Sequence, residues 1–240
     1  MADQERYRVA AWYTLDGDLR FLSHHDELRL LARALVRAGW PLRYSQGFNP
    51  LPRMSLPLPR RVGIASECQL AVVELRAESD TKQLTESLAA VLPAQCTLRE
   101  ILAPLPPGKP HARVVEYVVP LSMRDARTVA PRLPALLERE HIIVQRRNYN
   151  MPVPRQLDIR PFIELLGIDG SVLRMRLEVI DQRSARPSEI ITELGLAADA
   201  YTHRVRRTAV NWDMELTSTG GAPVPPKGID LGNEKEISHH

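Results

Sequence analysis

The sequence contains little cysteine, no long hydrophobic run and no secretion signal. Cys68 and Cys96 are its only cysteines, so it can neither build a disulfide framework nor supply four ligands to an iron–sulfur cluster. No segment approaches the roughly 18 apolar residues that a membrane-spanning helix needs, and the charged first residues lack the apolar core of a signal peptide. These absences predict a cytoplasmic protein that makes no contact with a membrane.

The sequence also lacks recognisable catalytic and metal-binding motifs. It contains no glycine-rich phosphate loop, no nucleophile elbow and no paired-carboxylate motif. His111, His141 and His203 stand apart from one another, so none of them has the spacing of zinc ligands. We therefore predict no metal site and no cofactor, and no catalytic residue other than one histidine considered below.

Lysine is scarce, because 28 of the 32 basic residues are arginine. The guanidinium group is a planar fork that matches phosphate and carboxylate, whereas the lysine ammonium is a point charge. Codon preference in a GC-rich genome explains the arginine excess equally well. The net charge is only +3, so any binding of a polyanion would depend on local clustering. Such a cluster lies between residues 20 and 61, where eight arginines face one aspartate and one glutamate, a balance of +6.

The pattern of apolar residues predicts an α+β fold. Residues 7–102 show the order strand, helix, strand, strand, helix, strand, which is the ferredoxin-like order. In this part we expect strands at 7–13, 42–45, 54–58, 69–76 and 96–102, and helices beginning after Ser23 and spanning 81–92. The prolines at 52, 57 and 59 confine the strand at 54–58 to a sheet edge.

A similar pattern follows the proline-rich segment 103–110. We expect strands at 114–121, 142–147, 157–165, 172–180 and 201–212, a helix after Ser122 that prolines interrupt, and a helix at 187–194. The prediction is therefore two tandem ferredoxin-like (β-α-β-β-α-β) halves, residues 5–103 and 112–213, joined by a proline-rich linker. Residues 214–240 are rich in glycine and proline and are expected to form a disordered tail.

The segment Phe21-Leu-Ser-His-His-Asp-Glu-Leu-Arg29 reads as the start of a helix, with Ser23 and Asp26 in capping-box spacing. His24 and His25 occupy the first turn, where the electropositive helix end disfavours a protonated imidazole. A neutral histidine there could accept a proton or bind a ligand, or it could simply pack beside the cap.

Arg29, Arg33 and Arg37 follow at intervals of four and share one face of this helix. Like charges at this spacing cost a few tenths of a kcal/mol each. Acidic neighbours elsewhere in the fold or an anionic partner would offset that cost. A plain solvated face is the other interpretation.

The segment Tyr44-Ser-Gln-Gly-Phe-Asn-Pro-Leu-Pro-Arg53 reads as a turn built from residues with special backbone preferences. Gly47 permits a positive φ and Asn49 favours an Asx turn. Phe48 either plugs the core beneath the turn or is an exposed aromatic beside Arg43 and Arg53, suited to stacking on a base or holding an anion. The predicted binding residues are Ser23, His24, Asp26, Arg29, Arg33, Arg43, Ser45, Gly47, Phe48, Asn49 and Arg53.

Five motifs resemble the radical-SAM-linked protein family, a bacterial domain of unknown function found beside or fused to cobalamin-binding radical SAM proteins. They are Phe21–Asp26, Tyr44–Pro50, Asp158-Ile-Arg-Pro161, Arg186-Pro187 and Arg207-Thr208. The resemblance covers roughly residues 6–212. His25 stands where the family usually has leucine, and Leu51 where it usually has histidine. The resemblance names no reaction, but it implies a radical SAM protein as partner.

Three functions follow as hypotheses. The first is a non-catalytic accessory or adaptor protein of a radical SAM enzyme, with RNA or another anionic substrate as a candidate ligand of the basic N-terminal surface. The alternative is a metal-independent endoribonuclease, in which His24 takes the proton of a ribose 2′-hydroxyl and Arg43 or Arg53 stabilises the phosphate. A pure protein scaffold is the third interpretation, and it expects the arginines to be paired with acidic residues.

Overall fold

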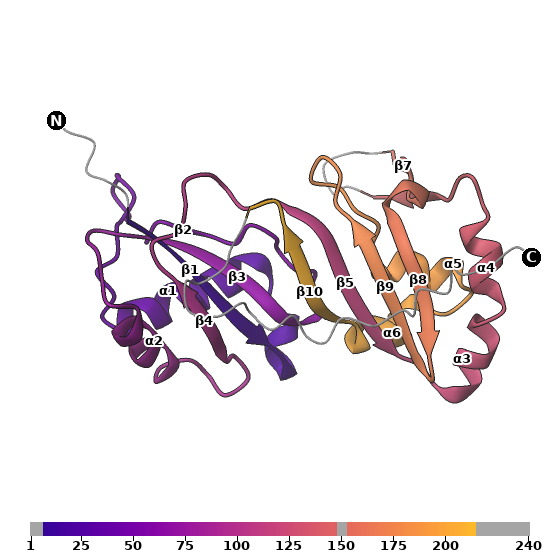
Figure 1. Ribbon diagram of the computed structural model, residues 1–240, viewed down its shortest axis with the longest axis horizontal. Helices are drawn as coiled ribbons and strands as arrows, with labels where there is room; N and C mark the ends of the chain where they lie inside the picture. The colour runs from indigo at the N-terminus through magenta and orange to yellow at the C-terminus, as the bar shows by residue number, and fades with distance from the viewer. Residues whose placement is uncertain (1–6, 148–152, 215–240) are drawn as a thin grey trace, which may run out of the picture.

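The computed structural model describes residues 7–147 and 153–214 and shows a mixed α+β protein built on one large sheet (Figure 1). The strands of that sheet are β1 (Tyr7–Leu15), β2 (Met54–Ser55), β3 (Ala65–Leu75), β4 (Leu98–Leu102), β5 (Ala112–Pro120), β8 (Ile163–Asp169), β9 (Val172–Glu178) and β10 (Arg206–Trp212). Their order is β4-β1-β3-β10-β5-β9-β8, and β2 pairs with β3 beside this path. A separate ribbon consists of β6 (Ile143–Arg146) and β7 (Arg155–Asp158).

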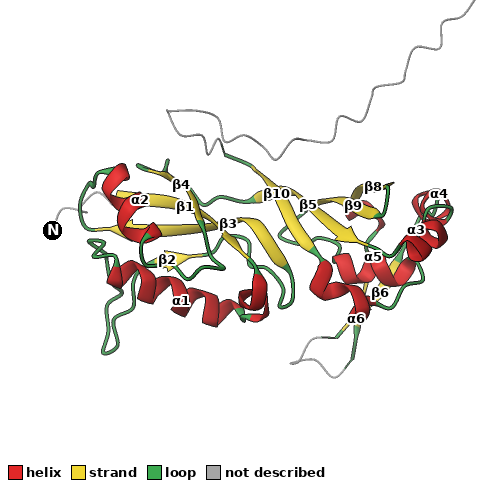
Figure 2. Ribbon diagram, turned by 90° about the horizontal axis from the view of Figure 1, so that it is seen from below, coloured by secondary structure: helices red, strands yellow, loops and turns green. Residues whose placement is uncertain are grey.

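The helices pack mainly against one side of the sheet, where α1 and α5 lie on the same side in Figure 2. They are α1 (His24–Arg37), α2 (Thr81–Ala89), α3 (Met123–Val129), α4 (Arg132–Leu137), α5 (Pro187–Glu193) and α6 (Ala198–Tyr201). Short 3₁₀ helices are η1 (Gly17–Phe21), η2 (Arg160–Phe162) and η3 (Thr202–Arg204). Among the described residues no helix has the length and apolar character needed to cross a bilayer.

The first helix forms as its sequence predicts. The Ser23 hydroxyl accepts a hydrogen bond from the Asp26 amide at 3.2 Å and so caps α1. Leu31 and Leu35 are buried one helical turn apart and form the apolar stripe that packs on the sheet. Gly39 follows with φ of +71°, the left-handed conformation that commonly ends a helix at glycine. Local signals therefore mark where α1 begins and where it ends.

Apolar clusters lie under the helices of both halves. In the N-terminal half, Leu35 of α1 and Leu88 of α2 pack with Val9 and Val73 of the central strands. In the C-terminal half, Ile190 of α5 belongs to a larger core; Val129, Leu133, Leu173 and Leu194 also belong to it. Each half therefore has its own core.

The last strand joins the two halves into one sheet. Figure 1 shows the amber β10 between the purple β3 and the magenta β5. It pairs in parallel with β3, with Arg206 opposite Ala65 and Arg207 opposite Ser66, and antiparallel with β5. The chain thus returns to the middle of the sheet after completing the C-terminal half, and the proline-rich segment is not the only connection between the halves.

The observed elements depart from the predicted ones at the edge of the N-terminal half. Residues 42–45 form only isolated bridges, Leu42 with Leu75 and Tyr44 with Pro52, and the predicted strand at 54–58 shrinks to the two residues of β2. Proline has no amide hydrogen to donate to a strand neighbour, so the prolines of this segment prevent a continuous ladder. The predicted strand at 142–147 pairs only within the β6-β7 ribbon, outside the main sheet.

The N-terminal element order is the predicted one, β1-α1-β2-β3-α2-β4. The description of both halves as ferredoxin-like remains a prediction, as do the domain limits 5–103 and 112–213. Residues 215–240 of the expected disordered tail lie outside the described residues.

The core of the N-terminal half yields a stability prediction. Leu35 is 2 % exposed and Val36, the next residue, is 53 % exposed. We expect Leu35→Ala to lower the free energy of unfolding by about 2–5 kcal/mol, because it leaves a cavity among packed side chains. Val36→Ala should change it by less than about 0.5 kcal/mol. Urea denaturation followed by circular dichroism measures both, and equal losses would contradict the assignment of the buried face.

Candidate functional site

A buried ion pair lies directly beneath the first candidate segment. The side chains of Glu27 and Arg60 are each 1 % exposed, and Nε of Arg60 lies 3.2 Å from Oε2 of Glu27. The other carboxylate oxygen of Glu27 accepts hydrogen bonds from the Tyr13 hydroxyl at 2.7 Å and from Nε2 of Gln69 at 2.5 Å. Both oxygens of this buried carboxylate therefore have partners, as a charge removed from water requires.

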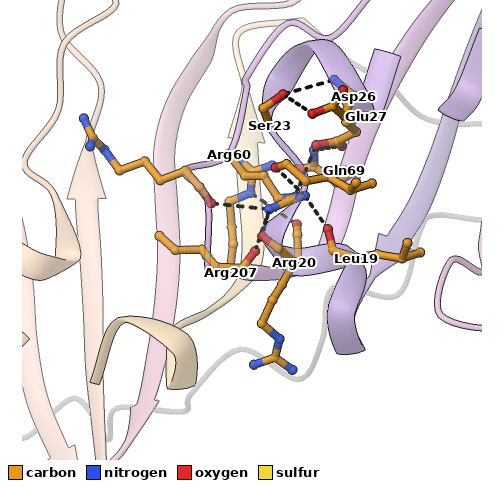
Figure 3. Close-up of polar contacts among 12 residues, drawn as sticks. Leu19, Arg20, Ser23, Asp26, Glu27, Arg60, Gln69 and Arg207 are labelled. Carbon is orange, nitrogen blue, oxygen red and sulfur yellow. Dashed lines mark hydrogen bonds and ion pairs between the residues drawn. The ribbon is translucent and has the colours of Figure 1, made fainter. Parts of the chain in front are cut away.

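Arg60 also binds the backbone that leads into α1 (Figure 3). Its guanidinium group donates to the carbonyl oxygens of Leu19 at 2.8 Å, Arg20 at 2.5 Å and Leu22 at 3.3 Å. A further bond reaches the carbonyl of Ile64 at 3.2 Å. One guanidinium group therefore holds η1, the start of α1 and the segment that precedes β3 in a single arrangement.

The surroundings of this pair suppress acid–base reactivity nearby. Burial, with the negative charge of Glu27 second, raises the pKa of the Tyr13 hydroxyl well above its ordinary value. The same two causes raise the pKa of the Cys96 thiol to about 12. Both groups are neutral at physiological pH, and a thiol in this state is a poor nucleophile. The network is structural in character.

The outer face of α1 forms one wall of a groove of about 920 Å³. Residues lining it are Leu22, Asp26, Arg29, Leu30, Ala32, Arg33, Val36, Arg37, Pro52, Val91 and Pro93. Arg29 pairs with Asp26 at 3.3 Å, and Arg37 donates to the carbonyl of Val91 at 2.8 Å. Arg33 is exposed and has neither an ion pair nor a side-chain hydrogen bond within residues 7–147 and 153–214. Asp26 thus offsets the charge of Arg29, and the carbonyl of Val91 accepts from Arg37, whereas Arg33 has no such partner among the described residues.

The second candidate segment is a loop that leaves the sheet edge and returns to it. The Arg43 amide donates to the Glu74 carbonyl, and the Glu74 amide donates to the Arg53 carbonyl, each at 2.9 Å. Arg43 and Arg53 therefore both pair with Glu74 of β3, and residues 44–52 form the loop between them. Ser45 closes the loop, because its amide donates to the Leu51 carbonyl at 2.8 Å and its hydroxyl accepts from the Leu51 amide at 3.0 Å.

The tip of this loop is fully exposed. Phe48 has 107 % relative exposure and Leu51 has 68 %, so Phe48 does not plug the core. Gly47 adopts φ of +135°, and a Cβ atom at this position would meet nothing within 4 Å. The backbone conformation, not a lack of space, thus favours glycine here. Asn49 is exposed beside Phe48.

Arg43 and Arg53 lie at the base of the loop and are half-buried. Arg53 approaches Glu74 to 3.8 Å, a long ion pair. Pro52, at the base of the loop, lines the same groove as Arg29 and Arg33. One predicted residue, His24, lines another cavity.

His24 faces a different cavity, of about 420 Å³, at the junction of the two halves. The lining residues are His24, Arg60, Arg61, Val62, Ile64, Pro187, Ser188, Thr202 and Val205. Arg43 and Arg53 are not among them. Nδ1 of His24 is buried and has no hydrogen-bond partner among the described residues, whereas His25 is exposed. Within the described residues no group of three histidine, cysteine or acidic side chains is arranged to hold a metal ion.

Sequence reasoning missed the Glu27–Arg60 pair and the position of Arg61. One signal could have revealed the pair: Glu27, Leu31 and Leu35 recur at intervals of four, so Glu27 lies on the buried stripe of α1. A carboxylate on such a stripe needs a buried partner. The identity of that partner could not be read from the sequence, because Arg60 is one of eight nearby arginines.

Comparison with known proteins identifies one family whose model matches most of the chain. The model of a family described as an uncharacterized protein conserved in bacteria (DUF2344) matches residues 6–187. No curated protein matches the sequence significantly. The structure of an unknown protein from Galdieria sulphuraria is 14 % identical and covers 87 % of this chain and 98 % of its own, with a TM-score of 0.24. Such a low score supports no argument about fold or function.

The buried pair generates a prediction. Glu27→Gln keeps the size of the side chain and removes its charge, which leaves the Arg60 cation buried without a counter-charge. We expect the free energy of unfolding to fall by about 3–5 kcal/mol. Glu86→Gln, the same change at an exposed position of α2, is the matched control and should be neutral. Denaturant titration measures the free energy of unfolding of both variants. An unaltered stability of Glu27→Gln would show that the pair is dispensable.

Proposed function

The chain belongs to this family of proteins conserved in bacteria, and we propose that it is a non-catalytic adaptor that docks onto a radical SAM enzyme. The docking face consists of Asp26, Arg29, Arg33 and Arg37 of α1 with Phe48 and Leu51 of the loop 44–52. One observation supports this most directly: Arg33 lines the groove and forms no ion pair with an acidic group among the described residues, and Pro52 at the base of the loop lines the same groove.

The composition of the groove favours a protein partner over a nucleic acid. Its arginines alternate with apolar residues such as Leu30, Val36 and Val91. Protein interfaces are enriched in arginine and aromatic residues and poor in lysine. Affinity for RNA comes chiefly from neutralising many phosphates, and this groove offers three arginines and one aspartate. An acidic, partly apolar segment of a partner protein matches it better.

The identity of the partner rests on the family resemblance of the five sequence motifs. The chain has only two cysteines, one half-buried and one buried, and a four-cysteine cluster needs twice that number. Any radical SAM chemistry would therefore belong to the partner. In this arrangement the present chain would position or stabilise the enzyme or its substrate.

We also infer that both halves are ferredoxin-like. In the N-terminal half the fourth, first, third and second strands lie side by side as β4-β1-β3-β2, and in the C-terminal half as β10-β5-β9-β8 if the β6-β7 ribbon is an insertion. Neighbouring strands within each set are antiparallel. Both sets have the strand order expected of that fold, which supports the inference.

The endoribonuclease alternative has less support. It requires His24 to act with Arg43 or Arg53, whereas His24 lines a cavity with Arg60 and Arg61. Arg60 is already committed to Glu27 and to backbone carbonyls. A cleavage assay on single-stranded RNA tests this alternative directly, and activity lost in His24→Ala would favour it over the adaptor.

The adaptor proposal predicts which surface captures the partner. The protein should retain a radical SAM enzyme from nuclease-treated native lysate, identified by mass spectrometry. Reversing two charges on the docking face, Arg29→Glu with Arg33→Glu, should reduce that capture about tenfold or more, because charge complementarity becomes repulsion. Phe48→Ala should also weaken capture without changing stability, since the side chain is fully exposed.

The control carries the same change of net charge on the other half of the molecule. Arg124 and Arg127 are exposed on α3, and reversing both should leave capture intact. Equal losses in the two double variants would contradict a specific docking face. Recovery of RNA alone, lost on nuclease treatment, would replace the protein partner by a nucleic acid.

A further inference from the structure

A second charged region lies at the junction of the two halves, away from the docking face. The cavity containing His24 and Arg61 is lined from the N-terminal half also by Arg60, Val62 and Ile64, and from the C-terminal half by Pro187, Ser188, Thr202 and Val205. In Figure 2 the N-terminal end of α1 faces the helices α5 and α6 of the other half. The volume of about 420 Å³ is within the range of small-molecule sites.

Near this cavity two arginines share one carboxylate. Arg146 forms a two-pronged ion pair with Glu189, with Nε at 2.7 Å and Nη2 at 2.8 Å from its two oxygens. The side chain of Arg186 approaches the same carboxylate only to 3.6 Å. Arg61 lines the cavity and has neither an ion pair nor a side-chain hydrogen bond within the described ranges. The positive charge of Arg61 is therefore not paired with a described carboxylate.

The arginines near the cavity act on one another's pKa values. Burial lowers the pKa of Arg61; the charge of Glu189 raises it, and the charge of Arg146 lowers it by a smaller amount. Burial lowers the pKa of Arg186 to about 10, with the charges of Arg61 and Arg146 next in importance. An anion beside Arg61, which is exposed and lies near these other guanidinium groups, would favour its charged form.

Other lining groups indicate what kind of anion fits. Nδ1 of His24 is buried without a partner, and the Ser188 hydroxyl makes no hydrogen bond among the described residues. Val62, Ile64 and Val205 form apolar walls. The guanidinium fork of Arg61 matches phosphate oxygens. The apolar walls leave room for an organic group attached to it.

We propose that this junction cavity binds a phosphate monoester, with Arg61 as the principal ligand of the phosphate and Ser188 and His24 as further polar contacts. Two separate motifs of the sequence, Phe21–Asp26 and Arg186-Pro187, meet there only because the chain folds. A mononucleotide or a sugar phosphate carries such a group as a free molecule. An oligonucleotide carries one at its 5′-phosphorylated end, which is the polymeric source. The site shares no residue with the docking face.

The test uses the full chain with inorganic phosphate and adenosine 5′-monophosphate as probes, at constant ionic strength set with sodium chloride. Calorimetric titration and thermal melting should show saturable binding of both probes, whereas adenosine should not bind. Arg61→Gln should weaken binding at least tenfold, because the charged fork is lost. Arg124→Gln, at an exposed arginine of α3, should bind as the unaltered protein does.

Two further arms make the outcome decisive. Ser188→Ala should weaken binding severalfold even if Arg61→Gln melts at a lower temperature than the unaltered protein. Oligoribonucleotides with 5′-phosphate and 5′-hydroxyl ends distinguish the polymeric from the free source. Absence of saturable phosphate binding, or equal binding by Arg61→Gln and Arg124→Gln, would overturn the proposal while leaving the adaptor function untouched.

Discussion

The buried pair between Glu27 and Arg60 is the contact on which both proposed binding surfaces depend. Charges taken out of water are tolerated only when each has a partner and their remaining hydrogen-bonding positions are filled. Here Tyr13 and Gln69 donate to one carboxylate oxygen, Nε of Arg60 forms only an ion pair with the other, and carbonyls of η1 and its neighbours accept from Nη1 and Nη2 of Arg60. The pair thereby anchors the start of α1, which carries the proposed docking face on its outer side and His24 at its first turn. A change in this pair would displace both surfaces together.

The return of β10 to the middle of the sheet is the second constraint. Arg207 is 1 % exposed and donates to the hydroxyl of Ser66 at 3.3 Å and to the carbonyl of Leu58 at 3.1 Å. This side chain ties the last strand to the N-terminal half. The junction cavity exists because the two halves share one sheet, with α5 brought beside the start of α1. A cavity lined from both halves needs such a rigid connection.

Most of the arginines whose contacts are described have structural partners. Arg160 binds the carbonyls of Leu137 and Ile163, and Arg176 bridges Glu116 and Glu164. The five donors of a guanidinium group suit such multiple contacts, which one ammonium group cannot satisfy in the same planar geometry. The arginine excess therefore has a structural use in addition to any effect of codon preference. Arg33 and Arg61 lie outside this majority, as do other arginines such as Arg124 and Arg127, but only Arg33 and Arg61 of these four line the cavities on which the two proposals depend.

The sequence by itself determined the features that depend on residues close together in the chain. The Ser23 cap, the apolar stripe of α1, the break after Gly39 and the prolines that interrupt the sheet edge all act within a few residues of one another. Only the tertiary structure decided that Phe48 is exposed, that Glu27 pairs with Arg60, and that His24 lies beside Arg61 and Pro187. Those outcomes depend on which distant segments pack together, because solvent exposure and charge pairing arise from the whole fold and not from local backbone preference.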